Sequence, residues 1–475
     1  MQKKPIFFDP TGRRAIHVSR FALAAGVIST LFVVACAVSL FVGPNMSGLH
    51  LGGQGKTRHA LTGVKAAAPE LLKPAAKRAA EVRARQKLLH PPHTHASKGA
   101  GVHTPPPSLD KPADRPLAIG FYVNWDDSSY PSLKRALPTL DWVIPTWMSV
   151  SGPDMALHTD IDAKALNLIR AQKPSTPILP LLQNAVNGSW DGPGLARMLA
   201  DPATRQARIA QIVAFLAANR LQGVTIDFEE VPESSQKDLK AFLSELNDAF
   251  DPHGWGIVLS VPFDDADWDY AGYADIVDFE LLMAYDQHWA GKDAGSIAAE
   301  DWFESTLDKR MKVLDPDQVI VAIGSYGYDW SHGQNAEALT FQDAMDRASD
   351  AQVDIAFDPD TQNPNFSYSE DDGSTHQVWF LDGVTAYNQI HAADDYKPYG
   401  YALWRLGSED PSVWSVLGRN YGTPAPEQLR TIGQGEDIDI EGQGEVLEIA
   451  AQPSPGARSI EVDKDDGSID DGSYS

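Results

Sequence analysis

The sequence predicts an α/β protein whose main part is a (β/α)8 barrel, or TIM barrel, with a small β-hairpin insertion. Short apolar segments alternate with amphipathic segments over roughly 310 residues that follow residue 115, which is enough chain for eight strand and helix pairs. Hydrophobic residues make up 43% of the 475 residues, so a large core is available. Two acidic residues also stand at the end of one predicted strand, where the active sites of such barrels are assembled.

Eight segments have the composition of short buried strands. They are residues 117–123, 141–148, 177–182, 222–229, 256–262, 277–285, 319–326 and 398–405. Segments with helical periodicity lie between them, such as residues 205–220 and 235–250, and Ser235 stands in the position of a helix cap. A doubly wound open sheet is the alternative that this alternation leaves open. Residues 355–380 depart from the alternation and predict an inserted hairpin around an Asp-Asp-Gly turn.

The N-terminal region predicts a membrane anchor. Residues 1–20 carry five basic residues and one acidic residue, whereas residues 21–43 carry no charge. An uncharged helix of this length spans the hydrocarbon core, and the basic residues before it are expected to stay in the cytoplasm. The rest of the chain is therefore expected on the periplasmic or extracellular side of an inner or plasma membrane, which the chain crosses once. A cleaved signal peptide, a lipoprotein site at Cys36 and a twin-arginine signal are the alternatives.

Residues 44–115 predict a disordered basic linker. They are rich in alanine, proline, glycine and lysine and contain 12 basic and 4 acidic residues. Four of the six histidines in this segment, all within residues 90–103, invite a metal-site interpretation, but they lack carboxylate or cysteine partners, which favours a polar linker. These histidines are His90, His93, His95 and His103.

The charge of the remaining chain excludes one class of partner. From residue 116 onward there are 60 acidic and 22 basic residues, so phosphate would be repelled and no nucleic acid is expected to bind. All 12 tryptophans lie in the same region. An acidic, tryptophan-rich domain suits neutral or cationic glycans, although tryptophan is also core material. The single cysteine forbids an intrachain disulfide.

The segment Gln222-Gly-Val-Thr-Ile-Asp-Phe-Glu-Glu230 carries the chemistry. On an extended strand, Asp227 and Glu229 share one face, with Cα atoms about 6.6–6.8 Å apart. An ionised Asp227 beside Glu229 in a partly desolvated site is expected to raise the pKa of Glu229, which keeps a proton available for donation. Taken alone, such a pair of acids more often marks a hydrated strand end. Glu230 is expected to point the other way.

The order of several motifs resembles glycoside hydrolase family 18, the family of chitinases and endo-N-acetylglucosaminidases. Its fourth strand carries D-G-x-D-x-D-x-E, in which Asp227 and Glu229 match the last two acids, and Gln222 and Thr225 stand at the first two. The first, sixth and eighth strands of the family resemble Gly120-Phe-Tyr-Val-Asn-Trp125, Met283-Ala-Tyr-Asp286 and Tyr401-Ala-Leu-Trp404. The hairpin is similar to that of the branch with peptidoglycan-directed spore hydrolases, where the middle aspartate is also absent.

The resemblance implies a barrel over residues 116–430 that hydrolyses glycans by a substrate-assisted retaining mechanism. Glu229 would protonate the glycosidic oxygen, Asp227 would orient the acetamido N–H of the sugar, and Tyr285 would hold its carbonyl group. Trp404 would lie under the reacting sugar. The other expected substrate-binding residues are Asp286, Met283, Tyr122 and Thr225. Neither a cofactor nor a metal ion is expected.

The two ends of the chain resemble a more specific group of membrane-anchored proteins. In that group such a domain precedes a polysaccharide deacetylase and a family 2 glycosyltransferase. The resemblance rests on Phe7-Phe-Asp-Pro-Thr-Gly-Arg-Arg14, on the predicted membrane helix and on an acidic tail over residues 431–475. We therefore expect a deacetylase and a glycosyltransferase as partners, either on separate chains or in a longer form of this one.

Three functions follow from these expectations. The first is a membrane-tethered hydrolase of β-linked N-acetylglucosamine polysaccharide, such as peptidoglycan, chitin-like oligomers or exported poly-N-acetylglucosamine. The second is a catalytically weak or inactive module that binds or guides a glycan during its synthesis or export, which the two replaced aspartates motivate. The third is a barrel hydrolase that uses external water as its nucleophile.

Overall fold

The computed structural model describes residues 58–60, 106–186, 188–331, 335–421, 437–441 and 448–452. The predicted cytoplasmic segment, the predicted membrane helix over residues 21–43 and the four linker histidines lie outside the described residues. Among the described residues, no helix combines the length and the hydrophobicity needed to cross a bilayer. Within the range of the predicted linker, Pro107–Leu109 forms a 3-10 helix whose Leu109 is completely buried.

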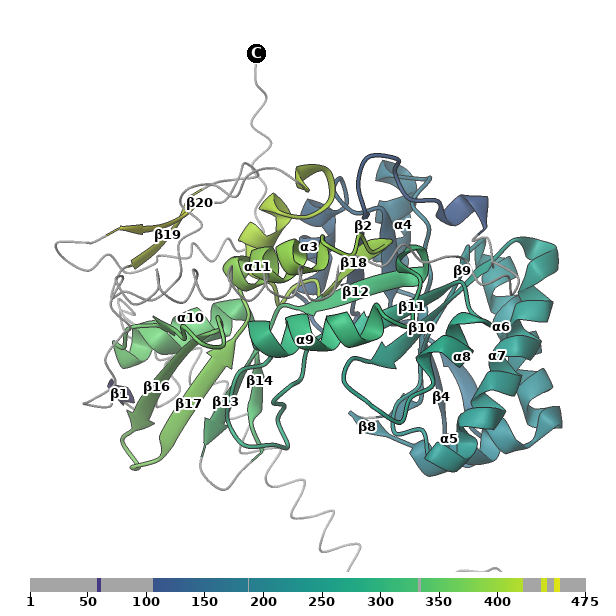
Figure 1. Ribbon diagram of the computed structural model, residues 1–475, viewed down its shortest axis with the longest axis horizontal. Coiled ribbons are helices and arrows are strands. Elements are labelled where there is room, and N and C mark those ends of the chain that lie inside the picture. The colour runs from purple at the N-terminus through teal and green to yellow at the C-terminus, as the bar shows by residue number, and fades with distance from the viewer. Residues whose placement is uncertain are drawn as a thin grey trace, which may run out of the picture. The chain divides into compact units, whose positions relative to one another are not determined.

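A curled parallel sheet forms the centre of the domain (Figure 1). Its strands follow one another in the order β3, β2, β18, β12, β11, β10, β9, β6 and β4, and the antiparallel strand β5 lies at the end. β3 and β4 are two parts of the second predicted strand, and a parallel bridge from Val143 to Ile178 joins β3 to the segment before β6. The eight strand positions therefore close into the predicted barrel, and the open-sheet alternative is wrong. The bounds are β2 Leu117–Tyr122, β3 Trp142–Pro145, β4 Met148–Ser151, β5 Ala156–Thr159, β6 Leu181–Gln183, β9 Gly223–Asp227, β10 Gly256–Pro262, β11 Phe279–Met283, β12 Val319–Gly324 and β18 Gly400–Trp404.

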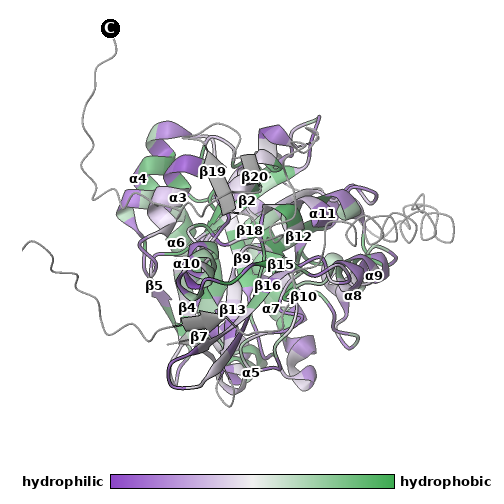
Figure 2. Cartoon of the chain, turned by 90° about the vertical axis from the view of Figure 1, so that its left-hand side faces the viewer, coloured by the Kyte–Doolittle hydropathy of each residue, from purple (hydrophilic) through white to green (hydrophobic). Residues whose placement is uncertain are grey.

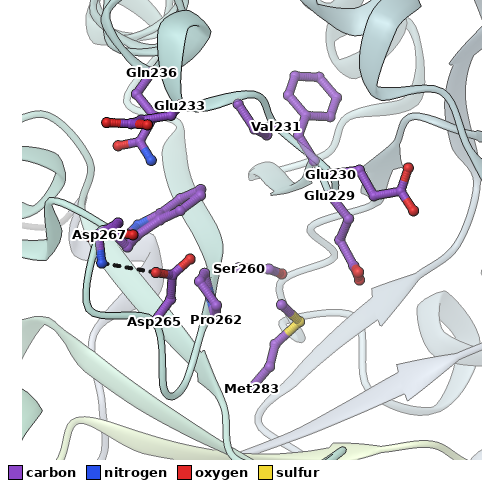
Figure 3. A pocket seen from close by; sticks show the side chains of 12 residues that line it. Glu229, Glu230, Val231, Glu233, Gln236, Ser260, Pro262, Asp265, Asp267 and Met283 are labelled. Carbon is purple, nitrogen blue, oxygen red and sulfur yellow. Dashed lines mark hydrogen bonds between the residues drawn. The ribbon is translucent and has the colours of Figure 1, made fainter. Parts of the chain in front are cut away.

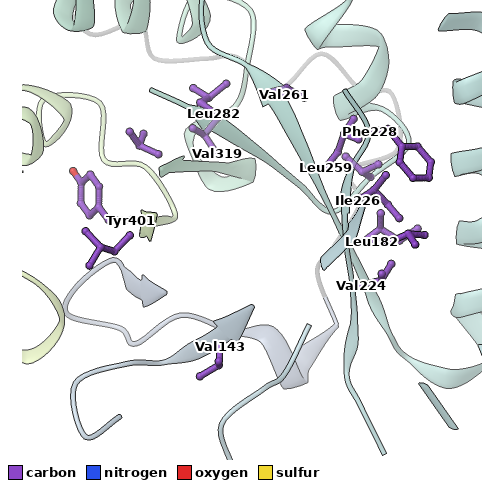
Figure 4. Packing of buried hydrophobic residues seen from close by; sticks show 14 of the residues in the cluster. Val143, Leu182, Val224, Ile226, Phe228, Leu259, Val261, Leu282, Val319 and Tyr401 are labelled. Atoms are coloured by element: carbon purple, nitrogen blue, oxygen red, sulfur yellow. The ribbon is translucent and has the colours of Figure 1, made fainter. Parts of the chain in front are cut away.

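The strands bury both of their faces. One set of side chains, including Ile119, Phe279 and Ile320, fills the inside of the barrel, and the alternate set packs under the surrounding helices. In Figure 4, Leu182, Ile226 and Leu259 gather on neighbouring strands as part of this outer layer. Figure 2 shows hydrophobic residues along the barrel strands and hydrophilic residues along the outer helices and loops. The alternation of side chains predicted for β9 is confirmed, because Val224, Ile226 and Phe228 pack in the outer layer and Asp227 lies on the inward face.

Helices follow most strands and cover the barrel. Asp162 and Asp201 cap α4 and α6 by accepting hydrogen bonds from main-chain N–H groups of the first turn. Ser235 is the N-cap residue of α7, as predicted, but the chain enters the helix through a 3-10 turn, Glu233–Ser235, and the Ser235 side chain makes no capping bond. The helices are α3 Ser129–Ala136, α4 Ala163–Gln172, α5 Gly192–Ala200, α6 Pro202–Asn219, α7 Gln236–Phe250, α8 Tyr270–Ala274, α9 Glu300–Arg310, α10 Phe341–Ala351 and α11 Gly383–Ala393.

The insertion is larger than the predicted hairpin. The hairpin itself is confirmed as β16 and β17, but β13, β14, β15 and α10 belong to the same unit, in which α10 packs on the sheet (Figure 1). A buried carboxylate, Asp329, ties the unit together, because it accepts a hydrogen bond from the hydroxyl of Tyr368 at 2.5 Å and pairs with Arg347 and His376. The strand bounds are β13 Gly327–Ser331, β14 Glu337–Leu339, β15 Ala356–Phe357, β16 Pro364–Glu370 and β17 Thr375–Phe380.

Three further pairs complete the described structure. The strand β1 (Arg58–Ala60) pairs antiparallel with β16 of the insertion. The hairpin of β7 (Ala185–Val186) and β8 (Ser189–Trp190) follows β6. Within the predicted tail, β19 (Asp437–Glu441) and β20 (Glu448–Gln452) form an antiparallel pair.

Candidate active site

Asp227, the last residue of β9, lies at the carboxyl end of the barrel strands and is 6% exposed. Parallel pairing places Gln183 of β6 beside it, and the Nε2 atom of Gln183 donates to Oδ2 of Asp227 at 2.8 Å. The hydroxyl of Ser260 on β10 also forms a hydrogen bond with Asp227. Burial raises the pKa of Asp227 to about 6, and the two hydrogen bonds oppose that rise because they favour the charged form. The carboxyl group is therefore mostly ionised at pH 7.

Glu229 follows two residues later and carries the opposite protonation state. Burial, followed by the negative charges of Asp227, Asp286 and Glu230, raises its pKa to about 8. Glu229 thus holds a proton near neutral pH while Asp227 has lost its own. This is the arrangement that a general acid with a charged neighbour requires.

The main chain of Glu229 is fixed from the next strand. The N–H of Glu229 donates to Oδ1 of Asn184 at 2.9 Å, and the carbonyl oxygen of Glu229 accepts from Nδ2 of the same side chain at 2.9 Å. Figure 3 shows the Glu229 carboxyl group pointing toward Met283, whereas the Glu230 side chain points away. The expectation that the side chains of Glu229 and Glu230 point in different directions is therefore confirmed.

The sixth barrel strand brings Met283 and Tyr285 to the same site, because both pack on the side chains that fill the inside of the barrel. Burial raises the pKa of Tyr285 well above its usual value, and the negative charges of Asp227, Asp286 and Glu229 raise it further. The hydroxyl of Tyr285 accordingly keeps its proton and is a hydrogen-bond donor at every physiological pH.

Asp286 turns the chain out of the barrel with a left-handed backbone conformation, φ 59°. Its carboxylate accepts hydrogen bonds from Tyr326 at 2.5 Å and from Tyr328 at 3.2 Å. Although part of the residue is open to solvent, protein surrounds the carboxyl group, and this burial raises the pKa of Asp286 against the effect of the two hydrogen bonds. Tyr328 belongs to β13, so the insertion takes part in the site.

Trp404 stands at the end of β18, on the inward side. Its ring meets Phe121 edge-on, with a centroid distance of 5.1 Å and an interplanar angle of 72°. The rest of the indole lines a cavity at the mouth of the barrel. An aromatic face at this place offers a platform for a sugar ring.

Two cavities are lined by hydrogen-bond partners of Asp227, although Asp227 itself lines neither. The larger, about 690 Å³, is lined by Gln183, and the smaller, about 310 Å³, is lined by Ser260 and Glu229 (Figure 3). The larger cavity is rich in tryptophan, with Trp125, Trp147, Trp190 and Trp404. Five acidic residues line the smaller cavity, namely Glu229, Glu230, Glu233, Asp265 and Asp267. None of the described residues that line the smaller cavity is basic, so its chemistry disfavours anionic groups.

Two of the predicted substrate-binding residues lie elsewhere. Tyr122 is on the outward face of β2, 2% exposed, and its hydroxyl donates to the carboxylate of Asp162 at the start of α4. Thr225 is on the inward face of β9 but is completely buried below Asp227, where its hydroxyl donates to the carbonyl oxygen of Leu179 at 3.3 Å. The prediction that they contact substrate is therefore wrong. The other six predicted residues converge at one end of the barrel.

The site also contains residues that the sequence did not indicate, namely Gln183, Asn184, Ser260, Tyr326 and Tyr328. The only signal for the first two was their place at the end of a predicted strand, next to the strand that carries the acids. Among the described residues, no group of three or more His, Cys, Asp and Glu side chains is arranged to hold a metal ion.

Comparison with known proteins identifies the family. The family model of glycosyl hydrolases family 18 matches residues 118–410, which is more than half of the chain. The chain belongs to glycosyl hydrolase family 18. Proteins similar to this chain include the putative sporulation-specific glycosylase YdhD of Bacillus subtilis, which is 28% identical over 246 residues, and the human di-N-acetylchitobiase, which is 23% identical over 264 residues. The alignments cover 50% and 46% of this chain and 58% and 69% of those proteins.

Two solved structures share the fold of this chain. The spore cortex-lytic enzyme SleL of Bacillus cereus gives a TM-score of 0.58 at 21% identity, covering 64% of this chain and 73% of that one. A chitinase from Chromobacterium violaceum gives the same TM-score at 22% identity, covering 63% of this chain and 97% of that one. The match to YdhD spans 58% of the length of that protein. The activity and partners of the present protein are therefore proposed below.

Proposed function

We propose that this protein is a membrane-tethered hydrolase of β-linked N-acetylglucosamine polysaccharide that acts by substrate-assisted retaining catalysis. The observation that carries the proposal is the meeting of Glu229, Asp227 and Tyr285 at the end of the barrel, where Glu229 lines a cavity. A related family 18 structure, an Ostrinia furnacalis chitinase domain with a TM-score of 0.52, was solved in complex with penta-N-acetylchitooctaose. That complex supports the class of substrate.

The proposed chemistry divides among three side chains. Glu229 gives its proton to the glycosidic oxygen as the bond from that oxygen to the anomeric carbon breaks. The acetamido carbonyl oxygen of the same sugar attacks the anomeric carbon, while Asp227 accepts a hydrogen bond from the acetamido N–H and Tyr285 donates one to the acetamido oxygen. Water then opens the cyclised sugar and returns a proton to Glu229. The raised pKa of Glu229, to about 8, and that of Asp227, to about 6, supply the two protonation states that this sequence of steps needs.

A second candidate function is a module that binds or guides a glycan for a deacetylase or a glycosyltransferase. The observation that favours it is Thr225, which stands where the family has an aspartate and makes its hydrogen bond away from Asp227. In this alternative the cavities bind a sugar chain, but hydrolysis assisted by Glu229 is too slow to be the function of the protein.

A hydrolysis screen separates the two functions. Wild-type protein is incubated with peptidoglycan, chitin oligomers and poly-N-acetylglucosamine, and the new reducing ends and product masses are measured. Glu229→Gln is expected to lower hydrolysis by roughly 10²–10⁴-fold while sugar binding persists. Glu233→Gln is the matched control, because it removes an exposed carboxyl group from the same cavity. Absence of product from all three polymers with wild-type protein favours the binding module.

The proposed location has a test of its own. We propose that the helix over residues 21–43 holds the barrel on the periplasmic or extracellular side of the inner or plasma membrane. A tag fused after Ser475 is then expected to be degraded by protease added to spheroplasts. Protection of the tag in intact spheroplasts contradicts the outward placement.

A further inference from the structure

Asp227 has no acidic partner on its own strand. Thr225 precedes it by two residues on the same face, is completely buried and donates its hydroxyl to Leu179. The hydroxyl of Thr225 therefore bonds to the main chain just before β6 and not to Asp227. Whatever orients Asp227 must come from the adjoining strands.

Gln183 supplies that contact. The register of β6 with β9 puts Gln183 directly opposite Asp227, and the bond from its Nε2 atom to Oδ2 is 2.8 Å long. Gln183 also lines the larger cavity. One side chain therefore connects the occupant of that cavity to the orientation of Asp227.

Asn184, the next residue, holds the second acid through its main chain. Its amide group forms two hydrogen bonds with Glu229, one to the N–H and one to the carbonyl oxygen, and the side chain is 0% exposed. Two bonds from one planar group fix both the position and the tilt of the peptide at the base of the Glu229 side chain.

We propose that Gln183 and Asn184 are positioning residues: Gln183 orients the carboxyl group of Asp227, which Thr225 does not contact, and Asn184 fixes the main chain from which the Glu229 side chain extends. The inference rests on the proposed hydrolytic function. An amide differs from a carboxyl group in one respect that matters here, because it donates a hydrogen bond but exchanges no proton near neutral pH. Gln183 therefore favours the charged form of Asp227 without sharing its proton, and Asp227 keeps a single orientation.

The pH profile of kcat/KM tests the role of Gln183, with a fluorogenic chito-oligosaccharide as substrate. Gln183→Met keeps the length of the side chain and removes the donor, so the charged form of Asp227 loses one of its hydrogen bonds. The acid limb of the profile is expected to move up by about one pH unit. This lowers kcat/KM by about fivefold at pH 6 and by less than twofold at pH 7.5.

Gln222→Met is the matched control. Gln222 lies at the opposite end of the barrel, where its amide accepts a hydrogen bond from the N–H of Ile178 and donates one to the carbonyl of Arg220. The same substitution there removes comparable hydrogen bonds far from Asp227, and it is expected to leave the acid limb in place. An unchanged acid limb in Gln183→Met, or an equal displacement in both variants, overturns the proposal for Gln183.

Asn184→Asp tests the second residue, since it keeps the shape of the side chain but removes the donor to the Glu229 carbonyl. It is expected to lower kcat by about tenfold or more with little change in KM, because the general acid is displaced while the sugar-binding surfaces are intact. A rise in KM at constant kcat contradicts this role. Thermal unfolding of each variant shows whether a lower kcat results only from a smaller fraction of folded protein.

A second experiment distinguishes failure of the proposed hydrolytic function from failure of the positioning role. If wild-type protein hydrolyses no polymer, the dissociation constant of a thiazoline mimic of the cyclised sugar is measured against pH. The mimic needs an ionised Asp227, so Gln183→Met is expected to move its binding curve to higher pH even without turnover. Coinciding curves for wild type and variant, or a mimic that wild type does not bind, overturn the positioning role.

Discussion

The charge of Asp227 is expected to add to the effect of burial on the pH at which Glu229 loses its proton. Strand geometry separates two residues of the same face by about 6.6–6.8 Å, and at an effective dielectric constant of about 20 two unit charges at that distance repel by about 2.5 kcal/mol. That energy corresponds to nearly two pH units in the ionisation of Glu229. Because side-chain movement and water weaken the repulsion, we expect Asp227→Asn to move the alkaline limb of kcat/KM down by about one to two pH units.

The assay is the pH profile from pH 5 to 9 on a fluorogenic chito-oligosaccharide. Wild type is expected to give a bell with limbs near pH 6 and 8, which belong to Asp227 and Glu229 acting as a coupled pair. Asp227→Asn lowers the whole profile, because the acetamido N–H loses its acceptor. If the alkaline limb stays at the wild-type pH, the reasoning about the two charges is refuted.

Stability gives the same information without turnover. A carboxyl group whose pKa is raised by folding destabilises the protein progressively as the pH rises from the unfolded pKa to the folded pKa. Glu229→Gln is therefore expected to stabilise the protein increasingly between about pH 4.5 and 8. In the Asp227→Asn background this increase should end at a lower pH. Thermal unfolding across the pH range measures both curves.

Three further predictions concern single side chains. Tyr285→Phe is expected to lower kcat by about 10- to 100-fold without loss of thermal stability, because it removes the hydrogen bond that holds the acetamido oxygen in position for attack on the anomeric carbon; an unchanged kcat contradicts the role of Tyr285. Trp125, which is 61% exposed in the larger cavity, is expected to stack on a distant sugar, so Trp125→Ala should raise KM several-fold for long oligomers and leave that of short ones unchanged. Equal KM changes for both lengths tell against this contact. Glu280 is completely buried on the outward face of β11, and burial raises its pKa well above the usual value. Glu280→Gln should therefore raise the melting temperature more at pH 8 than at pH 4 and leave hydrolysis unaffected, whereas a lower melting temperature at pH 8 contradicts the cost assigned to this carboxyl group.

The barrel could be predicted because the strands are buried and their sequences are correspondingly apolar. Each strand is a short apolar run, and the alternation of Val224, Thr225, Ile226 and Asp227 gives the inward face directly. The insertion was only partly predicted, since β13 and β14 are short and of mixed polarity, and β13 joins the sheet by pairing with β17, which lies far along the chain. Such pairing depends on tertiary contacts and not on local sequence.

The site was predictable where the chemistry is charged. Asp227 and Glu229 form a recognisable pattern, but Gln183 and Asn184 do not, because a neutral amide becomes important only through the register between β6 and β9. Tyr122 was misplaced for a related reason. Both faces of β2 are buried, so the sequence of that strand does not reveal which side chains face the barrel interior.

The most direct measurement of the central claim is the release of new reducing ends from acetylated glucosamine polymers by wild-type protein, Glu229→Gln and Glu233→Gln, assayed side by side at pH 7. We expect wild type and Glu233→Gln to release reducing ends, and Glu229→Gln to release them at a roughly 10²–10⁴-fold lower rate. Equal rates for wild type and Glu229→Gln would contradict this expectation, because the proton donor would then lie elsewhere.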